Sequence, residues 1–295
     1  MVAQSAMDEG KPGEEFLALL LASQMRAVEA VAASAEVIAR AADALSERLA
    51  AGGRLIYIAA GSSGLIALQD GAELPGTFGI AASRIVFVLA GGMANVALLD
   101  AAVEDDITAA RRDVAALGPV DRDVVIAVSA SGSTPYTLAG AEAAREAGAR
   151  LIAIANRAAS PLLHIADFPI LLDSGPEALH GSTRLAAGTA QKSALGLLST
   201  LANARLGHVY RGHMVNLRPD NEKLRRRAVH IVATCAEVDE DKASASLKRA
   251  DGKVKCAILI AAGAATREIA GDLIDRADGH VGDALARLRA RPQEL

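Results

Sequence analysis

The first part of the chain has the hydrophobic pattern of a helix. From Glu14 to Ala51, apolar residues recur every three or four positions with charged residues between them, which places one apolar stripe along a helix. The stripe consists of Met25, Val28, Val31, Ile38, Ala41, Leu45 and Leu49. Glycines at 52 and 53 end the pattern, as glycine commonly does after a helix. Residues 1–13 are polar, and we expect a flexible N-terminus there.

Short apolar runs then alternate with helical segments. The first run, at residues 54–60, ends in the small residues GSSG and is followed by a helical pattern from about Gly64. Comparable runs lie at Arg84–Leu89, Asp123–Val128, Leu151–Ala155 and Phe168–Leu172. Strands that alternate with helices predict a parallel sheet with helices on both faces. We therefore expect an α/β, flavodoxin-like sheet that binds ligands at the carboxyl ends of its strands.

The character of the chain changes after Pro219. Before it, Arg184–Leu206 has the pattern of one long helix. After it, the segments are short, charged and helical, at Asp220–Glu237, Asp239–Ala250, Thr266–Ala277 and Val281–Ala290. The sequence thus predicts a main domain over residues 14–219 and a small helical subdomain over residues 220–295.

Composition narrows the function classes. The chain has 295 residues, of which 52% are hydrophobic and 2% aromatic, with a net charge of -4, so neither a basic groove nor stacked aromatic side chains are available for nucleic acid. The longest uninterrupted apolar run, Cys256–Ala265, is about half of the roughly 18 residues that a membrane span needs and fits a buried helix or strand. The N-terminus lacks the pattern of a signal peptide. We expect a cytoplasmic protein with no membrane or nucleic-acid partner, whose Cys235 and Cys256 are reduced and buried.

Three hydroxyl-rich loops are the main candidates for chemistry. They contain Ser62, Ser63 and Gly64; Ser131, Gly132, Ser133 and Thr134; and Ser182 and Thr183. Glycine allows close backbone approach, and hydroxyl and N–H groups at a helix N-terminus can hold phosphate oxygens. Small residues also simply make strand-to-helix turns, which would be the preferred explanation for a single loop. Three such loops favour phosphate recognition, and neither GxGxxG nor a Walker motif indicates a nucleotide.

Five segments of the chain together resemble a known family. They are GSSGLIALQDGAELPGTFG (61–79), AGG with VEDD (90–92 and 103–106), ASGSTPY (130–136), GPEALHGSTRLAAGTAQK (175–192) and MVNLRPDNEKL (214–224). In this order they are similar to signatures of the N-acetylmuramic acid 6-phosphate etherases. These are proteins with a sugar isomerase (SIS) domain, related to the glucokinase regulatory protein. The resemblance runs from about residue 50 to 225, and weakly beyond.

The resemblance implies a lyase that cleaves the lactyl ether of N-acetylmuramic acid 6-phosphate by elimination and hydration, giving N-acetylglucosamine 6-phosphate and D-lactate. It places the catalytic acid at Glu73 and the second catalytic glutamate, the base, at Glu104. Removing the C2 proton requires a base, and expelling the C3 oxygen requires an acid. Taken alone, Glu73 could cap or solvate the turn before Pro75, and Glu104 could belong to an acidic helix start.

Some positions depart from the family. The etherases usually have arginine where this chain has Leu65 and Ser133, and lysine where it has Ala186. Arg184 and Lys192 remain as candidate cations, although Lys192 could simply face solvent.

His180 precedes Gly181, where the family more often has threonine. It is a candidate for proton exchange, but a lone loop histidine is more often a surface residue. The histidines lack metal-ligand spacing, and we expect neither metal nor cofactor.

Two other functions stay open at this point. Aldose–ketose isomerisation of a phosphosugar needs the same C2 proton abstraction without a leaving group, and a phosphosugar-binding regulator needs no turnover. Retention of both glutamates argues against the regulator. By family resemblance we also expect a homodimer, with the first helix and the long helix from Arg184 as candidate interfaces.

Overall fold

The computed structural model describes residues 13–290. The predicted flexible segment 1–13 lies almost wholly outside the described residues. Contacts within the chain define two compact units. Unit 1 consists of the residues up to Gly71 with Ser83–Ser199, and unit 2 consists of Ala72–Ala82 with the residues from Thr200 onward. The boundary expected at residue 219 stays a prediction.

Unit 1 is built on a parallel five-stranded sheet in the order β2-β1-β3-β4-β5. The strands are β1 (Leu55–Ala59), β2 (Ile85–Leu89), β3 (Val124–Val128), β4 (Arg150–Ala155) and β5 (Phe168–Leu171). All residues of β1 and β3 are buried and nearly all are aliphatic, as expected of central strands covered on both faces. The predicted α/β class is therefore confirmed.

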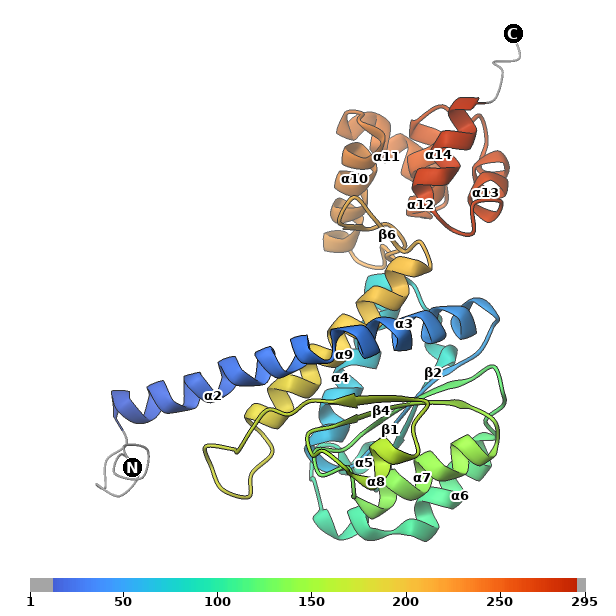
Figure 1. The fold of residues 1–295 in the computed structure, drawn as a ribbon. Coiled ribbons are helices and arrows are strands. Elements are labelled where there is room, and N and C mark those ends of the chain that lie inside the picture. Colours follow the sequence, from blue (N-terminus) through green and yellow to red (C-terminus); the bar gives the residue numbers. More distant parts are fainter. Residues whose placement is uncertain (1–12, 291–295) are drawn as a thin grey trace. The chain divides into compact units, whose positions relative to one another are not determined.

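Helices cover both faces of this sheet (Figure 1). On one face lie α6 (Ile107–Leu117), α7 (Pro135–Glu146) and the short α8 (Pro161–His164). Their apolar side chains form one core with Ile56, Ile58, Val125 and Leu151. On the other face lie α3 (Ala35–Ala50) and the unit 1 parts of α4 (Gly61–Phe78) and α9 (Ala186–Arg205). The short elements α5 (Gly92–Asn95), η1 (Ala82–Arg84) and η2 (Ala101–Asp105) border β2 or follow it.

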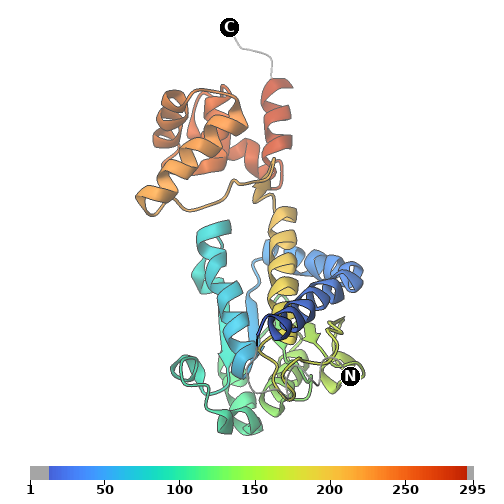
Figure 2. The same ribbon diagram turned by 90° about the vertical axis from the view of Figure 1, so that its left-hand side faces the viewer.

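Helices α4 and α9 lie side by side (Figure 2). Two hydrogen bonds join them at different heights, from Ser63 Oγ to Gln191 Oε1 (3.0 Å) and from Ser199 Oγ to Asp70 Oδ1 (2.8 Å). Asp70 also accepts a hydrogen bond from the Tyr57 hydroxyl at 2.6 Å. The pairing fixes the start of α4 relative to the start of α9, where two of the candidate loops meet their helices.

The N-terminal pattern gives two helices instead of one. The chain breaks at Ser34 between α2 (Glu14–Ala33) and α3. Helix α2 is long and apolar enough to cross a membrane by length and composition alone, with a mean hydropathy of 1.5 and 17% of the 18-residue window buried, and it is the one helix of this kind within residues 13–290. Its apolar sequence is interrupted by Ser23, Gln24, Arg26 and Glu29, so the sequence contains no long uninterrupted apolar run there.

Unit 2 is a helical bundle with a small antiparallel hairpin, β6 (Val209–Tyr210) and β7 (His213–Met214). Its helices are α10 (Glu222–Ala236), α11 (Glu240–Arg249), α12 (Val254–Ala261), α13 (Arg267–Asp275) and α14 (Val281–Ala290). Side-chain caps begin three of them, from Asn221, Asp239 and Thr266.

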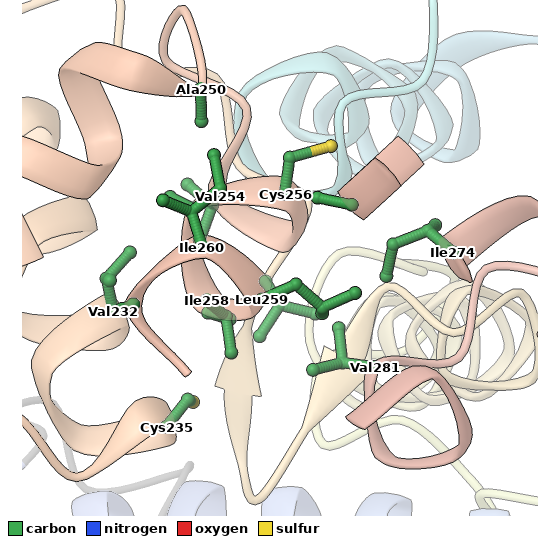
Figure 3. Packing of buried hydrophobic residues seen from close by; sticks show 14 of the residues in the cluster. Val232, Cys235, Ala250, Val254, Cys256, Ile258, Leu259, Ile260, Ile274 and Val281 are labelled. Carbon is green, nitrogen blue, oxygen red and sulfur yellow. The ribbon is translucent and has the colours of Figure 1, made fainter. Parts of the chain in front are cut away.

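Helix α12 is the centre of this bundle. All eight of its residues are buried, and Figure 3 shows its Ile258 and Leu259 among apolar side chains of other helices, such as Val232 and Ile274. The apolar run Cys256–Ala265, left as helix or strand by the sequence, is thus mainly helix. Cys235 and Cys256 are free and buried in this core, as expected.

Candidate active site

The first hydroxyl-rich loop forms the N-terminus of α4. Gly61 lies two residues after the end of β1 and adopts a positive φ of 53°. Ser63 and Gly64 are buried and Ser62 is half-buried. The first N–H groups of a helix have no partner within it and carry the positive end of the helix dipole, so this turn is suited to an anion.

Glu104 lies against this turn. A Cβ added at Gly61 would collide with the Glu104 carboxylate, whose Cδ would be 3.2 Å away. Glu104 belongs to η2, which begins where Asp100 Oδ1 accepts from the Ala102 N–H at 3.0 Å. Asn95 anchors the preceding segment, because its amide donates to the Ala90 carbonyl (3.2 Å) and its Oδ1 accepts from the Asp100 N–H (3.0 Å). The structure thus brings Glu104 to the carboxyl end of the sheet.

The environment of Glu104 makes it a better base. Partial burial, and then the neighbouring charge of Asp105, raise the pKa of its carboxyl above the usual value. A carboxylate with a raised pKa accepts a proton more readily than an ordinary one. Glu104 can therefore act as a proton acceptor beside the N-terminal turn of α4.

The second loop, Ser129–Thr134, is stabilised by its own side chains. Ser129 Oγ lies 2.9 Å from Thr134 Oγ1 and accepts from the Gly132 N–H at 3.1 Å. Ser131 Oγ accepts from the N–H and the hydroxyl of Ser133, both at 3.2 Å. Gly132 has a φ of 64°, and a Cβ there would collide with Ser160. Ser133 is exposed and Ser131 half-buried, which leaves both hydroxyls accessible to a ligand.

The third loop is closed by a carboxylate that the sequence reasoning missed. Glu177 accepts from the N–H groups of Ala186 (3.1 Å) and Ala187 (2.9 Å) and so caps the N-terminus of α9. Ser182 and Thr183 lie in the loop before this cap, half-buried and exposed respectively, and Ser182 Oγ accepts from the Arg184 N–H at 3.3 Å. The acidic residue within GPEALHGSTR was the available signal.

Sequence patterns also did not identify Gln191 and Asn156 as site residues. Gln191 is 1% exposed; besides accepting from Ser63, it donates to Asn156 Oδ1 at 2.9 Å. Asn156 in turn donates to the Leu172 carbonyl at 3.0 Å. This chain links the starts of α4 and α9 with the ends of β4 and β5. The signal was a polar residue at a strand end and a glutamine on an otherwise apolar helix face.

The remaining candidates lie on surfaces. His180 and Arg184 are exposed in the third loop, and Lys192 is exposed on α9. Glu73 is exposed on α4, in the 72–82 segment that groups with unit 2. Leu65 lines a small crevice of about 10 Å³ at the ends of β1 and β2.

The described residues, 13–290, contain no cluster of three or more His, Cys, Asp and Glu side chains that could hold a metal ion. At one end of the sheet, these residues bring together the Glu104 carboxylate, the N-terminus of α4 and two hydroxyl-bearing loops. This set can bind an anionic ligand and remove a proton from it.

Comparison with known proteins identifies the class and the family of this chain. Residues 21–156 match the family model described as the SIS domain, the class that the parallel sheet and its hydroxyl-rich loops define. The N-acetylmuramic acid 6-phosphate etherase of Deinococcus radiodurans is 41% identical over 272 residues, covering 92% of this chain and 89% of that protein. The etherase of Symbiobacterium thermophilum is 45% identical over 223 residues, covering 75% and 74%. The chain belongs to the N-acetylmuramic acid 6-phosphate etherase family.

A solved structure is also similar. A phosphoheptose isomerase from Neisseria gonorrhoeae is 23% identical, with a TM-score of 0.48 over 65% of this chain and 97% of that one.

Proposed function

We propose that this protein is a carbon–oxygen lyase that cleaves the lactyl ether of N-acetylmuramic acid 6-phosphate, yielding N-acetylglucosamine 6-phosphate and D-lactate. The observation that carries the proposal is the position of Glu104, a carboxylate of raised pKa held against Gly61 at the anion-binding turn of α4. Identity of 41% over 92% of the chain with a named etherase supports the choice of substrate.

The phosphate occupies the hydroxyl-rich loops. Its oxygens accept from backbone N–H groups and hydroxyls at Ser62 and Ser63 on α4, and at Ser131, Ser133 and Thr134 before α7. Ser182 and Thr183 contribute hydroxyls from the third loop. These groups suit a phosphate dianion because helix N-termini and oriented N–H groups provide positive potential without a cationic side chain. The net charge of -4 is therefore compatible with an anionic substrate.

Glu104 performs the first step. In the open-chain sugar, the C1 aldehyde acidifies the C2 proton, and Glu104 removes it. The C2–H electron pair then forms the C2=C3 double bond as the C3–oxygen bond to the lactyl group breaks. The raised pKa of Glu104 brings its basicity closer to what a general base needs near neutral pH.

Glu73 supplies the acid. It protonates the departing lactyl oxygen, so that D-lactate leaves with the former ether oxygen. Water then adds to the double bond, with its hydroxyl at C3 and a proton returned at C2. Two carboxyl groups thereby serve as acid and base.

The basic side chains that this chain retains bind the second anionic group of the substrate, the lactyl carboxylate. With Leu65, Ser133 and Ala186 at positions that are usually basic in the family, Arg184 and Lys192 are the cationic side chains left beside the third loop and on α9. An exposed arginine can form a bidentate pair with a carboxylate. We assign the lactyl carboxylate to Arg184, with Lys192 and His180 as secondary contacts.

Solvent isotope exchange tests these roles. In D₂O, Glu104→Gln is expected to abolish both D-lactate release and exchange at C2, because its base is lost. Glu73→Gln is expected to lose D-lactate release while retaining exchange at C2, because the proton is still removed. Deuterium at C2 of a product that keeps its lactyl group, formed by the wild type, would instead indicate an isomerase. Saturable binding with no exchange and no lactate would indicate a regulator.

We also propose a homodimer in the cytoplasm. Leu17, Leu21, Met25 and Val28 form a stripe on α2 and are each between 52% and 65% exposed, and Leu197 on α9 is 56% exposed. An exposed apolar stripe of this length is typical of a protein–protein interface. A second copy of the chain, packed through α2 and α9, would bury both.

A further inference from the structure

A large cavity lies within unit 2, apart from every residue assigned above. Its volume is about 990 Å³, and its lining residues all belong to the 72–82 segment and to residues after 200. Small-molecule sites in proteins usually occupy about 300–1,000 Å³. The cavity therefore has room for a metabolite larger than an inorganic ion.

A buried lysine lines this cavity. Lys255 on α12 is 8% exposed, and its ammonium donates one hydrogen bond to the Gly279 carbonyl at 2.8 Å. An ammonium has three N–H donors. Within residues 13–290 the Lys255 ammonium forms no second hydrogen bond. Burying a charged group whose N–H donors lack acceptors costs free energy, unless an opposite charge supplies those acceptors.

The rest of the lining is also mainly cationic. With Lys255, five lysine and arginine side chains and three aspartates line the cavity. Arg218, Arg225, Lys248 and Lys253 are exposed, and none of them forms an ion pair with another described side chain. Of the three aspartates, Asp251 is already paired with Arg267 at 3.3 Å. The cavity thus presents an excess of positive charge that the chain itself does not neutralise.

We infer that this cavity binds a small phosphomonoester, such as a sugar phosphate, with the phosphate on Lys255 and the organic part toward the rim cations. A dianion supplies the acceptors that the buried ammonium lacks and balances the rim charge. This goes beyond the proposed function, because the cavity shares no residue with the loops or with Glu73 and Glu104. It adds a second phosphosugar site to each chain.

The protonation states fit this assignment. Burial lowers the pKa of Lys255 to about 8, so the ammonium remains largely charged at neutral pH. Burial, and then the charges of Lys255 and His280, lower the pKa of His208 to about 3. His208 is therefore neutral, and its Nδ1 lies 3.0 Å from Asn203 Oδ1. A neutral imidazole leaves Lys255 as the cation inside the cavity.

Equilibrium dialysis with radiolabelled N-acetylglucosamine 6-phosphate counts the sites on the full chain. We expect two per chain in the wild type and one in Lys255→Met, which removes the ammonium. Ser62→Asp, which places a negative charge in the first loop, is expected to leave one, and the double variant none. Lys242→Met, an exposed lysine outside the cavity, is the matched control and should retain two. Unphosphorylated N-acetylglucosamine should show no cavity binding.

The number of sites distinguishes the alternatives. The cavity site would be ruled out if the wild type has one site that Lys255→Met retains, or if the wild type and Lys255→Met both have two sites. One site that Lys255→Met loses and Ser62→Asp retains would support the cavity and overturn the loop assignment instead. Because Lys255 is buried, the exposed pair Lys248→Gln with Lys253→Gln serves as a second variant. It should weaken cavity binding about tenfold or more with unchanged thermal unfolding, and unchanged affinity would count against the inference.

Discussion

Glu104 owes its position to the absence of a side chain at Gly61. The carboxylate occupies the space where any other residue would place a Cβ, and the backbone there has a positive φ that glycine adopts without strain. Asn95 and Asp100 then fix the segment that carries Glu104. Glu104 and the N-terminal turn of α4 are thus held together by Gly61, Asn95 and Asp100.

Replacing Gly61 should move the Glu104 carboxylate away from the N-terminal turn of α4. In Gly61→Ala, the Cβ displaces the Glu104 carboxylate, and we expect kcat/KM to fall about 100-fold, since displacements of about 1 Å in a catalytic group have effects of this size. The positive φ should also cost about 1–3 kcal/mol of stability. Steady-state kinetics and thermal unfolding measure both.

The control is Gly196→Ala, inside α9, where an added Cβ would have only Lys192 Nζ at 4.0 Å; this variant should keep full activity. A wild-type kcat/KM in Gly61→Ala would contradict the contact between Gly61 and Glu104.

Burial, and then the charge of Asp105, raise the pKa of Glu104 and should shift the pH dependence of activity. Glu104 must be deprotonated to act as base, so activity rises as pH increases through its pKa. Asp105 raises that pKa, and Asp105→Asn should therefore move the acidic limb of the kcat/KM profile to lower pH. Asp121→Asn, at an exposed turn before β3, should leave the limb in place. A limb that stays fixed in Asp105→Asn would assign it to another group.

At the scale of elements, helix α9 organises the site through polar side chains on its buried face. Gln191 joins the first turn of α4 to Asn156 after β4, and Glu177 satisfies the N–H groups at the start of α9. Helix propensity and hydrophobic period do not encode such links, because they depend on which residues the folded chain brings together. That is why the sequence predicted the loops by their hydroxyls and missed Gln191, Asn156 and Glu177.

Breaking the link should weaken substrate binding. Gln191→Leu leaves the Asn156 Oδ1 without its donor and frees the Ser63 hydroxyl, and we expect KM to rise about tenfold with a loss of about 1–3 kcal/mol of stability. Ser199→Ala removes the α9 hydrogen bond to Asp70, further along α9 from the loops. It should lower stability with an unchanged KM. Equal KM values in the two variants would limit Gln191 to a role in folding.

The element boundaries show where sequence patterns succeed. Strand runs ending in small residues predicted all five strands to within one or two residues, because buried parallel strands are aliphatic and their ends are loops. The break at Ser34 was missed because the apolar period continues through it. The hairpin β6–β7, with two residues in each strand, is too short to give a periodic signal.

At the scale of the whole molecule, the exposed stripe on α2 predicts the oligomeric state. Leu21→Glu with Met25→Glu places charges in the middle of the stripe and should convert a dimer into monomers, as measured by sedimentation velocity. Glu36→Gln, on α3 and outside the stripe, should not. A wild type that is monomeric at micromolar concentration, or a double variant that stays dimeric, would contradict the proposed interface.

The aliphatic composition of the chain reflects the cores of both units. Both units bury mainly Ala, Val, Leu and Ile, between the layers of unit 1 and around α12 in unit 2. The acidic net charge left no sign of the cationic cavity in unit 2, because a sum over the chain hides a local excess. Its lysines and arginines come from separate segments that only the folded bundle brings together.

The central claim is elimination followed by hydration, and an isotope experiment tests it directly. N-acetylmuramic acid 6-phosphate is turned over by the wild type in H₂¹⁸O, and the position of the label is read by mass spectrometry of D-lactate and by ¹³C NMR of the sugar. We expect one unlabelled D-lactate for each sugar and ¹⁸O at C3 of N-acetylglucosamine 6-phosphate. No lactate, or lactate whose hydroxyl carries the label, would contradict it.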